Sequence, residues 1–215
     1  MALIHTDGIL LDIDGTIWDS RELAAKGWNR AIRKYGINMP PVTAERLKSL
    51  FGKTMDVIAQ ELFLSVPAEQ VKPLYAECFR QEHIELEKNM TDITYPSVCD
   101  TIRQLSRTYK IFIVSNCQNG YIELLLRKTG LAPYISDSEC FGKTGKDKAY
   151  NIRLLSDRNN LKAPVYVGDT QGDSESSAAA GVPFIWASYG FGSPQSYDAK
   201  IETFAELETV VCLLG

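Results

Sequence analysis

Short apolar runs separated by helical patterns constrain the fold of this chain most strongly. Four runs rich in Val, Ile, Leu or Phe are too short for helices and predict buried strands: residues 8–13, 110–114, 164–167 and 182–187. Between them, apolar residues at helical spacing predict helices over 97–105, where Ser97 is expected to cap, 121–128 and 148–159. Strands that alternate with helices in this way indicate a doubly wound α/β fold with a parallel sheet.

One segment interrupts this alternation. From about Arg21 to about Asn89 the apolar residues follow a helical period, and no strand pattern is convincing. Thr43 is expected to cap a helix over 44–51, and Pro73 predicts a late start or a kink in a helix over 69–87. We therefore expect an α/β core of residues 1–20 and 91–215, with a small all-helical cap of residues 21–90 inserted after the first strand.

Composition and charge exclude several classes of protein. A net charge of -4 argues against binding to nucleic acid or to an anionic membrane, since both favour a basic protein surface. The 5 cysteines are scattered and odd in number, and the first residues do not read as a signal peptide. We expect a cytoplasmic protein with no nucleic-acid or membrane partner. The sequence predicts no oligomeric state.

The first predicted strand ends in two aspartates, Asp12 and Asp14. Alternate residues of a strand face the same way, so both carboxylates emerge together at its end. Ligands of an open α/β sheet bind at the carboxyl ends of strands, and a hard cation such as Mg²⁺ would relieve the repulsion. The alternative is that the two residues only shape a turn, as Asp-Gly pairs often do.

Two further strand ends carry polar residues. Gly168 and Asp169 follow the third predicted strand, and Asp173 comes four residues later at the start of a helix of small residues. Asp173 could simply stabilise that helix N-terminus. Ser115 and Asn116 follow the second strand and suit the binding of an anion, although an ordinary helix cap would have the same residue types. Two acidic strand ends in one sheet favour the metal site over the turn.

Together these motifs resemble the haloacid dehalogenase-like hydrolase superfamily, in its phosphoglycolate phosphatase-like branch with a helical cap. DIDGT, a Ser-Asn pair, a lysine before a helix, and GDTQGD stand in the family's order and spacing over essentially the whole chain. DIDGTIWDS and the later YGFG are similar to that branch. The resemblance implies a Rossmann-like core and a Mg²⁺-dependent phosphatase acting on a small phosphorylated metabolite, phosphoglycolate-like or sugar-phosphate-like.

The resemblance also implies a role for each motif residue. Asp12 would be the nucleophile that forms an aspartyl-phosphate, and Asp14 would be the general acid and base. Asp12, the Asp14 backbone carbonyl and Asp169 would hold Mg²⁺, with Asp173 in support. The residues that would hold the phosphoryl oxygens are Thr16, Ser115, Asn116 and a lysine.

The position of this lysine stays open. The segment CFGKTGKDKAYNI offers Lys143, Lys146 and Lys148, and the Lys-Pro pair common in this branch is absent. We favour Lys148, because it stands directly before the helical stretch AYNIRLL, as in family members whose lysine opens the helix, and place Lys146 second. The remaining two are expected to be solvated surface charges.

Other chemistries fit less well. Two Gly-Lys-Thr segments imitate the end of a nucleotide-binding P-loop, but Leu47 and Asp137 stand where its first glycine is required. The open alternatives are a phosphomutase with the same core, a metal-free dehalogenase and a non-catalytic binding module. Substrate selectivity is expected from the cap and its boundary, where Trp18, Arg21 and the Gly52-Lys53 turn are candidates.

Overall fold

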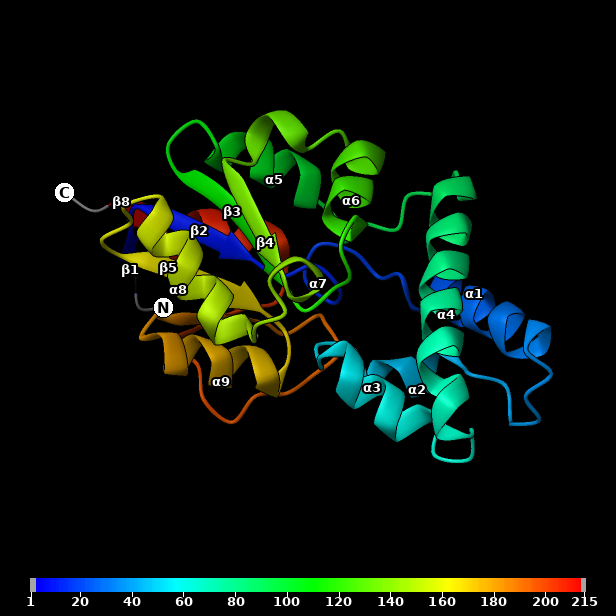
Figure 1. The fold of residues 1–215 in the computed structure, drawn as a ribbon. Helices are drawn as coiled ribbons and strands as arrows, with labels where there is room; N and C mark the ends of the chain where they lie inside the picture. Colours follow the sequence, from blue (N-terminus) through cyan, green and yellow to red (C-terminus); the bar gives the residue numbers. More distant parts are fainter. Residues whose placement is uncertain (1–2, 214–215) are drawn as a thin grey trace. The chain divides into compact units, whose positions relative to one another are not determined.

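The computed structural model describes residues 3–213, except for the Met55 side chain, and divides the chain into two compact units. Unit 1 comprises Met1–Asp19 and Thr94–Gly215, and unit 2 comprises Ser20–Ile93. Figure 1 shows the sheet in unit 1 and helices in unit 2. The predicted core range also includes residues 1, 2, 214 and 215, which lie outside the described residues.

A six-stranded parallel sheet forms the centre of unit 1 (Figure 1). Its strand order is β4-β3-β2-β5-β6-β7, and every neighbouring pair is parallel. This confirms the predicted α/β fold. The strands are β2 (Gly8–Leu11), β3 (Lys110–Ser115), β4 (Asp137–Cys140), β5 (Pro164–Gly168), β6 (Phe184–Ala187) and β7 (Ala199–Ile201).

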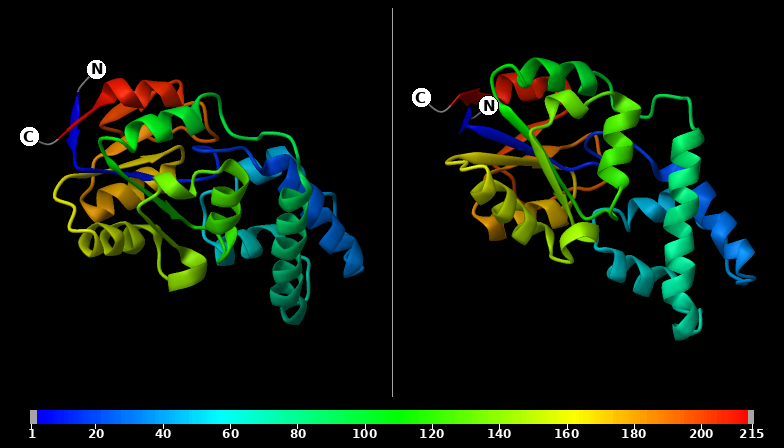
Figure 2. Two further views of the ribbon diagram at one scale, coloured as in Figure 1. Left: turned by 90° about the horizontal axis from the view of Figure 1, so that it is seen from above. Right: turned by 45° about the horizontal axis from the view of Figure 1, so that its top comes forward.

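Helices cover both faces of this sheet. Helices α8 and α9 pack together on one face, and α5 packs with α10 on the other (Figures 1 and 2). Strands enclosed on both faces must be apolar along their whole length, which explains the continuous apolar runs. The helices of unit 1 are α5 (Val98–Leu105), α6 (Tyr121–Thr129), α7 (Phe141–Thr144), α8 (Lys148–Arg158), α9 (Gln171–Ala180) and α10 (Leu207–Val210), with 3₁₀ turns at Ala132–Tyr134 and Phe204–Glu206.

Details of unit 1 differ from the sequence predictions. Ser97 lies at the start of α5, but it has a left-handed backbone (φ 66°) and its side chain makes no capping hydrogen bond. Capping requires an extended backbone that turns the hydroxyl toward the helix N–H groups. Strand β4 was not predicted, because its sequence is polar. Arg158 of α8 pairs with Asp137 and Glu139 of this strand at 2.9 and 3.1 Å. These ion pairs offset the negative charges of the strand and explain why a polar sequence can occupy this position in the sheet.

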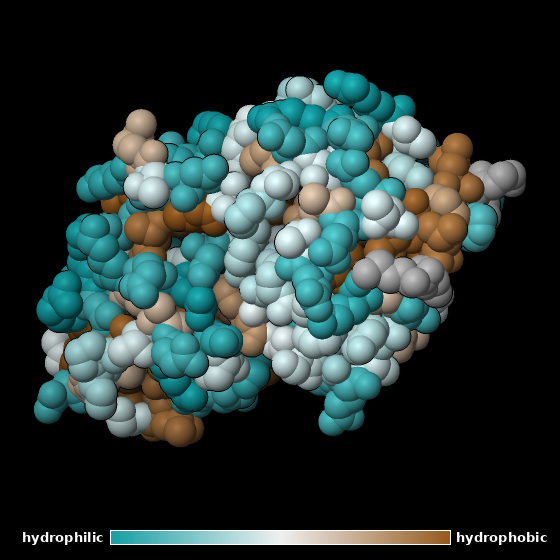
Figure 3. Space-filling view, turned by 180° about the vertical axis from the view of Figure 1, so that it is seen from behind, coloured by the Kyte–Doolittle hydropathy of each residue, from teal (hydrophilic) through white to brown (hydrophobic). Residues whose placement is uncertain are grey.

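The two ends of the chain form a separate parallel ribbon. Strand β1 (Ile4–Thr6) pairs with β8 (Val211–Leu213), with Ile4 opposite Val211. Neither strand was predicted, since three residues are too few for a periodic signal. Leu3 and Leu213 are exposed to 61% and 53%, and Figure 3 shows apolar surface beside the grey terminal residues.

The described residues of unit 2 form helices and no strand. They are α1 (Arg21–Lys34), α2 (Ala44–Lys48), α3 (Met55–Leu62) and α4 (Ala68–Lys88). Thr43 caps α2 as predicted, by accepting a hydrogen bond from Arg46 N at 3.1 Å, but the helix ends at Lys48. Helix α4 begins at Ala68, so Pro73 does not delay its start. None of the helices in residues 3–213 has the length and apolar character needed to cross a bilayer.

Helices α1 and α4 lie side by side in unit 2 (Figure 2). Trp28 Nε1 donates to Glu82 Oε2 at 2.7 Å, and Glu85 pairs with Lys26 and Arg30, each at 2.7 Å. Gly27 faces the α4 backbone: an added Cβ would lie only 2.6 Å from Glu82 N and 2.7 Å from the carbonyl carbon of Gln81. The close approach of the two helices therefore depends on a glycine at this position.

Gly27→Ala is expected to destabilise unit 2, although alanine normally favours a helix by about 1 kcal/mol over glycine. The new methyl group would strike backbone atoms, which cannot move aside cheaply, and we expect a cost of about 1–3 kcal/mol. Urea unfolding would measure it. The matched control, Arg33→Ala on the exposed face of α1, should stay within about 0.5 kcal/mol of the parent. A Gly27→Ala protein as stable as that control would contradict the packing argument.

Candidate active site

Three neighbouring strands bring the motif residues to one edge of the sheet. Strand β2 lies between β3 and β5, and all three run parallel. Residues that follow these strands therefore emerge side by side at the carboxyl edge, where α/β proteins bind ligands. Residues 12–16 follow β2, residues 115–116 end β3 and continue beyond it, and Asp169 follows β5.

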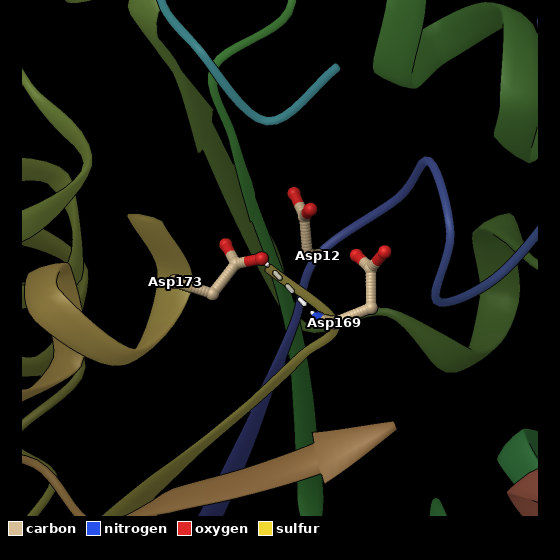
Figure 4. A group of neighbouring side chains, drawn as sticks. All are labelled: Asp12, Asp169 and Asp173. Carbon is tan, nitrogen blue, oxygen red and sulfur yellow. Dashed lines mark hydrogen bonds between the residues drawn. The ribbon is translucent and has the colours of Figure 1, made fainter. Parts of the chain in front are cut away.

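Asp12, Asp169 and Asp173 form a buried carboxylate cluster at this edge. Each offers a carboxylate oxygen, and these oxygens lie within 4.8 Å of one another. Their exposed fractions are 2%, 0% and 0%. Figure 4 shows the carboxylates of Asp12 and Asp169 pointing the same way, while an oxygen of Asp173 turns toward the Asp169 backbone. Three acids removed from water require positive charge or donors nearby.

Asp173 obtains its partners from the protein. Its Oδ2 accepts from the backbone N–H groups of Asp169 at 3.2 Å and Thr170 at 2.9 Å, and from the Thr170 hydroxyl at 2.6 Å. Thr170 and Asp173 thereby form the capping box that starts α9. Asp173 is therefore held in place by the helix terminus, which suits a supporting role beside the other two carboxylates.

Lys148 supplies positive charge to the cluster. Its Nζ lies 3.0 Å from Asp12 Oδ1 and 2.5 Å from Asp173 Oδ1, and the side chain is only 1% exposed. Lys148 is the first residue of α8, which Asp147 caps by accepting from Tyr150 N at 2.7 Å. Of the other two candidate lysines, Lys146 is exposed and Lys143 lies 3.8 Å from Glu139. The structure thus brings Lys148, rather than either alternative, to the carboxylates.

Burial is the largest single influence on the pKa of each of these groups, but neighbouring charges and hydrogen bonds outweigh it in two of them. It raises the pKa of Asp12 to about 7, although the Lys148 ammonium opposes the shift. Burial, reinforced by the charges of Asp173 and Asp12, also raises the pKa of Asp169 well above its usual range. For Asp173, burial is outweighed by Lys148, and the pKa is lowered. For Lys148, burial is outweighed by Asp12 and Asp173, and the pKa is raised.

Two glycines make room for the Asp169 carboxylate. A Cβ added to Gly15 would collide with this carboxylate, and one added to Gly190 would collide with Asp169 and with the Gly15 carbonyl oxygen. Phe191 N donates to Asp169 Oδ2 at 2.6 Å. Asp12 and Asp169 therefore present hard oxygen donors in a dry, shaped site, and these residues fit a Mg²⁺ ion. Such an ion would also favour their charged forms.

Asp14 is held by two aromatic side chains. Its Oδ1 accepts a hydrogen bond from Trp18 Nε1 at 3.0 Å and from the Tyr121 hydroxyl at 2.9 Å. Trp18 was a candidate for substrate selectivity at the cap boundary, but the structure places it in unit 1 and 2% exposed. Tyr121 was not identified from the sequence, because the residue at the start of α6 belongs to no motif.

Thr16, Ser115 and Asn116 occupy the same edge of the sheet, whereas Lys53 lies in unit 2. Thr16 is fully buried, and its hydroxyl lies 3.5 Å from Asp169 Oδ1. Ser115 ends β3 and is 5% exposed, and Asn116 follows it. In unit 2, Lys53 Nζ lies 2.8 Å from both carboxylate oxygens of Glu61. Its charge is therefore balanced by a neighbour in the same unit.

Comparison with known proteins shows to which family a chain with these residues belongs. The sequence pattern of the haloacid dehalogenase-like hydrolases matches residues 9–187, which is most of the chain. The chain belongs to the haloacid dehalogenase-like hydrolase family. Phosphoglycolate phosphatase of Escherichia coli K12 is 23% identical to this hydrolase over 222 residues, covering 89% of this chain and 84% of that protein.

Solved structures share the fold of this hydrolase. A predicted phosphoglycolate phosphatase from Haemophilus somnus superposes with a TM-score of 0.85 at 21% identity, covering 95% of this chain and 97% of that chain. A Rhodobacter sphaeroides protein, crystallised with xylulose-(1,5)bisphosphate, superposes with a TM-score of 0.79 at 17% identity, covering 96% and 100%. The family and the enzyme class expected from the sequence, a phosphatase of the haloacid dehalogenase-like hydrolases, are both confirmed.

Proposed function

We propose that this hydrolase is a Mg²⁺-dependent phosphatase that cleaves small phosphorylated metabolites through an aspartyl-phosphate on Asp12. The observation that carries the proposal is the buried cluster of Asp12, Asp169 and Asp173 around Lys148. A cluster of this kind is costly to bury, and perturbed acids in a strand-end site are typical of catalytic centres.

Asp12 is the proposed nucleophile. A carboxylate oxygen of Asp12 attacks phosphorus, an acyl-phosphate bond forms, and the bond between phosphorus and the ester oxygen breaks. Lys148, 3.0 Å from Asp12 Oδ1, favours the ionised form that this attack requires. Because Asp173 also binds Lys148, the ammonium is held beside the nucleophile rather than free to turn away.

Asp14 is the proposed acid and base. It gives its proton to the departing ester oxygen, and it then takes a proton from the water that attacks the phosphoenzyme. The alcohol and inorganic phosphate leave, and Asp12 and Asp14 return to their starting states. Both aspartates follow the same strand, β2, so the attacking and proton-transfer groups share one rigid support.

Asp12 and Asp169 are the side chains that would hold Mg²⁺, with the Asp14 backbone carbonyl as the third protein ligand. When bound, the ion would offset the negative charge shared by carboxylate and phosphate. Asp173, fixed by Thr170 and Lys148, supports the site. The proposed phosphoryl-binding groups are Thr16, Ser115, Asn116 and Lys148, which surround the ends of β2, β3 and β5.

The proposed substrates are small phosphate monoesters of the phosphoglycolate or sugar-phosphate kind. Support comes from relatives named as phosphoglycolate phosphatases and from the fold neighbour crystallised with xylulose-(1,5)bisphosphate. Release of inorganic phosphate from a panel of such metabolites would test the proposal. A phosphomutase would instead return the phosphoryl group to the substrate, so product without free phosphate would contradict hydrolysis.

Excess chelator is expected to abolish turnover of 4-nitrophenyl phosphate, and added Mg²⁺ is expected to restore it. The reason is that the buried acids need a cation to offset their charge beside an anionic substrate. Nitrophenolate release measured by absorbance is the readout. Full activity in excess chelator would remove Mg²⁺ from the proposal while leaving the aspartyl-phosphate route open.

A further inference from the structure

The acid/base residue of the proposed reaction has an unusual pair of neighbours. Both Trp18 Nε1 and the Tyr121 hydroxyl donate to the same oxygen, Asp14 Oδ1, at 3.0 and 2.9 Å. The two donors come from different parts of unit 1, one from the turn after β2 and one from the start of α6. Their convergence therefore depends on the tertiary structure and not on local sequence.

The two aromatic rings also support each other. Their centroids lie 5.6 Å apart at an interplanar angle of 82°, an edge-to-face contact, and the exposed fractions are 2% for Trp18 and 1% for Tyr121. The turn that carries Trp18 is tight, because the Ile13 carbonyl accepts from Thr16, Ile17 and Trp18 N–H groups. Neither donor can reorient without disturbing packing, so both hydrogen bonds are fixed in direction.

Two donors on one carboxylate oxygen have a chemical consequence. An oxygen that accepts two hydrogen bonds is a poor site for a third proton, so the transferable proton of Asp14 is carried by Oδ2. The bonds also restrict rotation of the carboxyl group, and proton transfer requires a heavy-atom separation of about 2.6–3.2 Å in the right direction. By orienting the Asp14 carboxyl group in this way, Trp18 and Tyr121 can accelerate the reaction without touching the substrate themselves.

The geometry points to Trp18 and Tyr121 as positioning residues that select Oδ2 of Asp14 as the proton-transferring oxygen and orient it. This inference rests on the proposed role of Asp14 as general acid. The competing explanation is purely structural: Asp14 would serve only as an acceptor for two buried donors. The explanations differ in what they predict for leaving groups, because only an aimed acid helps a poor leaving group more than a good one.

Tyr121→Phe tests the inference, since it removes one donor and keeps the ring that packs on Trp18. The readout is kcat/KM for an alkyl phosphate and for 4-nitrophenyl phosphate, because this constant covers the steps up to phosphoenzyme formation. We expect a loss of about tenfold on the alkyl ester, whose leaving oxygen needs a proton, and less than about twofold on the nitrophenyl ester. Trp18→Phe, which removes the other donor, should change the ratio in the same direction.

Tyr189→Phe is the matched control. The Tyr189 hydroxyl donates to the Thr16 carbonyl at 2.9 Å, so this variant loses a hydrogen bond to the turn after β2. It leaves both hydrogen bonds to Asp14 in place. It should affect both esters alike. Equal losses on the two esters in Tyr121→Phe, or no loss at all, would overturn the positioning role. Failure of the proposed function looks different: the parent enzyme would then release phosphate from neither ester, or Asp14→Asn would lower kcat/KM for the two esters by the same factor.

Discussion

Asp12→Asn is expected to form no phosphoenzyme, whereas Asp14→Asn is expected to accumulate it. An amide cannot replace the attacking carboxylate, so Asp12→Asn should lose at least about a thousandfold in turnover. Asp14→Asn keeps the Asp12 nucleophile and, through its amide oxygen, an acceptor for Trp18 and Tyr121. With 4-nitrophenyl phosphate the first step needs little acid assistance, but the second step has lost its base.

The phosphoryl substrate for this experiment should carry radioactive phosphorus and an aryl leaving group. After rapid acid quenching, label should remain on the Asp14→Asn protein and be absent from Asp12→Asn. Label on Asp12→Asn would show that another residue is the nucleophile. Absence of label from both proteins, with phosphate still released by Asp14→Asn, would argue for direct attack by water.

Lys148→Met is expected to lose both activity and stability. Methionine retains much of the volume of the buried side chain but leaves Asp12 and Asp173 without the ammonium that lies 3.0 and 2.5 Å away. Removal of one partner from a buried ionic cluster costs about 3–5 kcal/mol. Turnover should fall by at least about a hundredfold, because a fixed positive charge beside the nucleophile is lost. Urea unfolding and aryl phosphate hydrolysis measure the two effects.

Lys146→Met provides the control for this variant. Lys146 lies two residues earlier, is exposed, and should change stability by less than about 0.5 kcal/mol while keeping the parent turnover. If Lys146→Met were inactive and Lys148→Met active, the lysine of the mechanism would be Lys146. If Lys148→Met were stable but inactive, Lys148 would act in the reaction without supporting the fold.

Much of the candidate site is visible in the sequence because strand ends carry a local signal. A run such as residues 8–13 predicts a buried strand, and two acids are unexpected at its end, Asp12 within the run and Asp14 directly after it. The same reasoning identifies Asp169. These residues lie within a few positions of the strand that places them, so no knowledge of distant contacts is needed to expect them at one edge.

Residues that depend on long-range contacts are not visible in this way. Tyr121 lies 107 positions from Asp14 in the chain, and no local pattern distinguishes it from a core tyrosine. Gly190 and Phe191 shape the Asp169 site from the segment after β6; they lie in the YGFG stretch that resembles the phosphatase branch, but nothing in that stretch indicates a contact with Asp169. Of the three lysines of residues 140–152, the sequence favours Lys148 only by its place beside the predicted helix, whereas the structure separates it from the other two by its burial against Asp12.

The sequence by itself determined the α/β class and the acids at two strand ends, because periodicity and turn residues act over a few positions. Only the tertiary structure decided which strands are neighbours and which lysine meets the carboxylates. It also decided that polar β4 is a strand and that Trp18 and Tyr121 converge on Asp14. Each of these depends on segments far apart in the chain that meet only when the sheet and its helices pack. Contacts between such distant segments produce no periodic pattern in a single sequence.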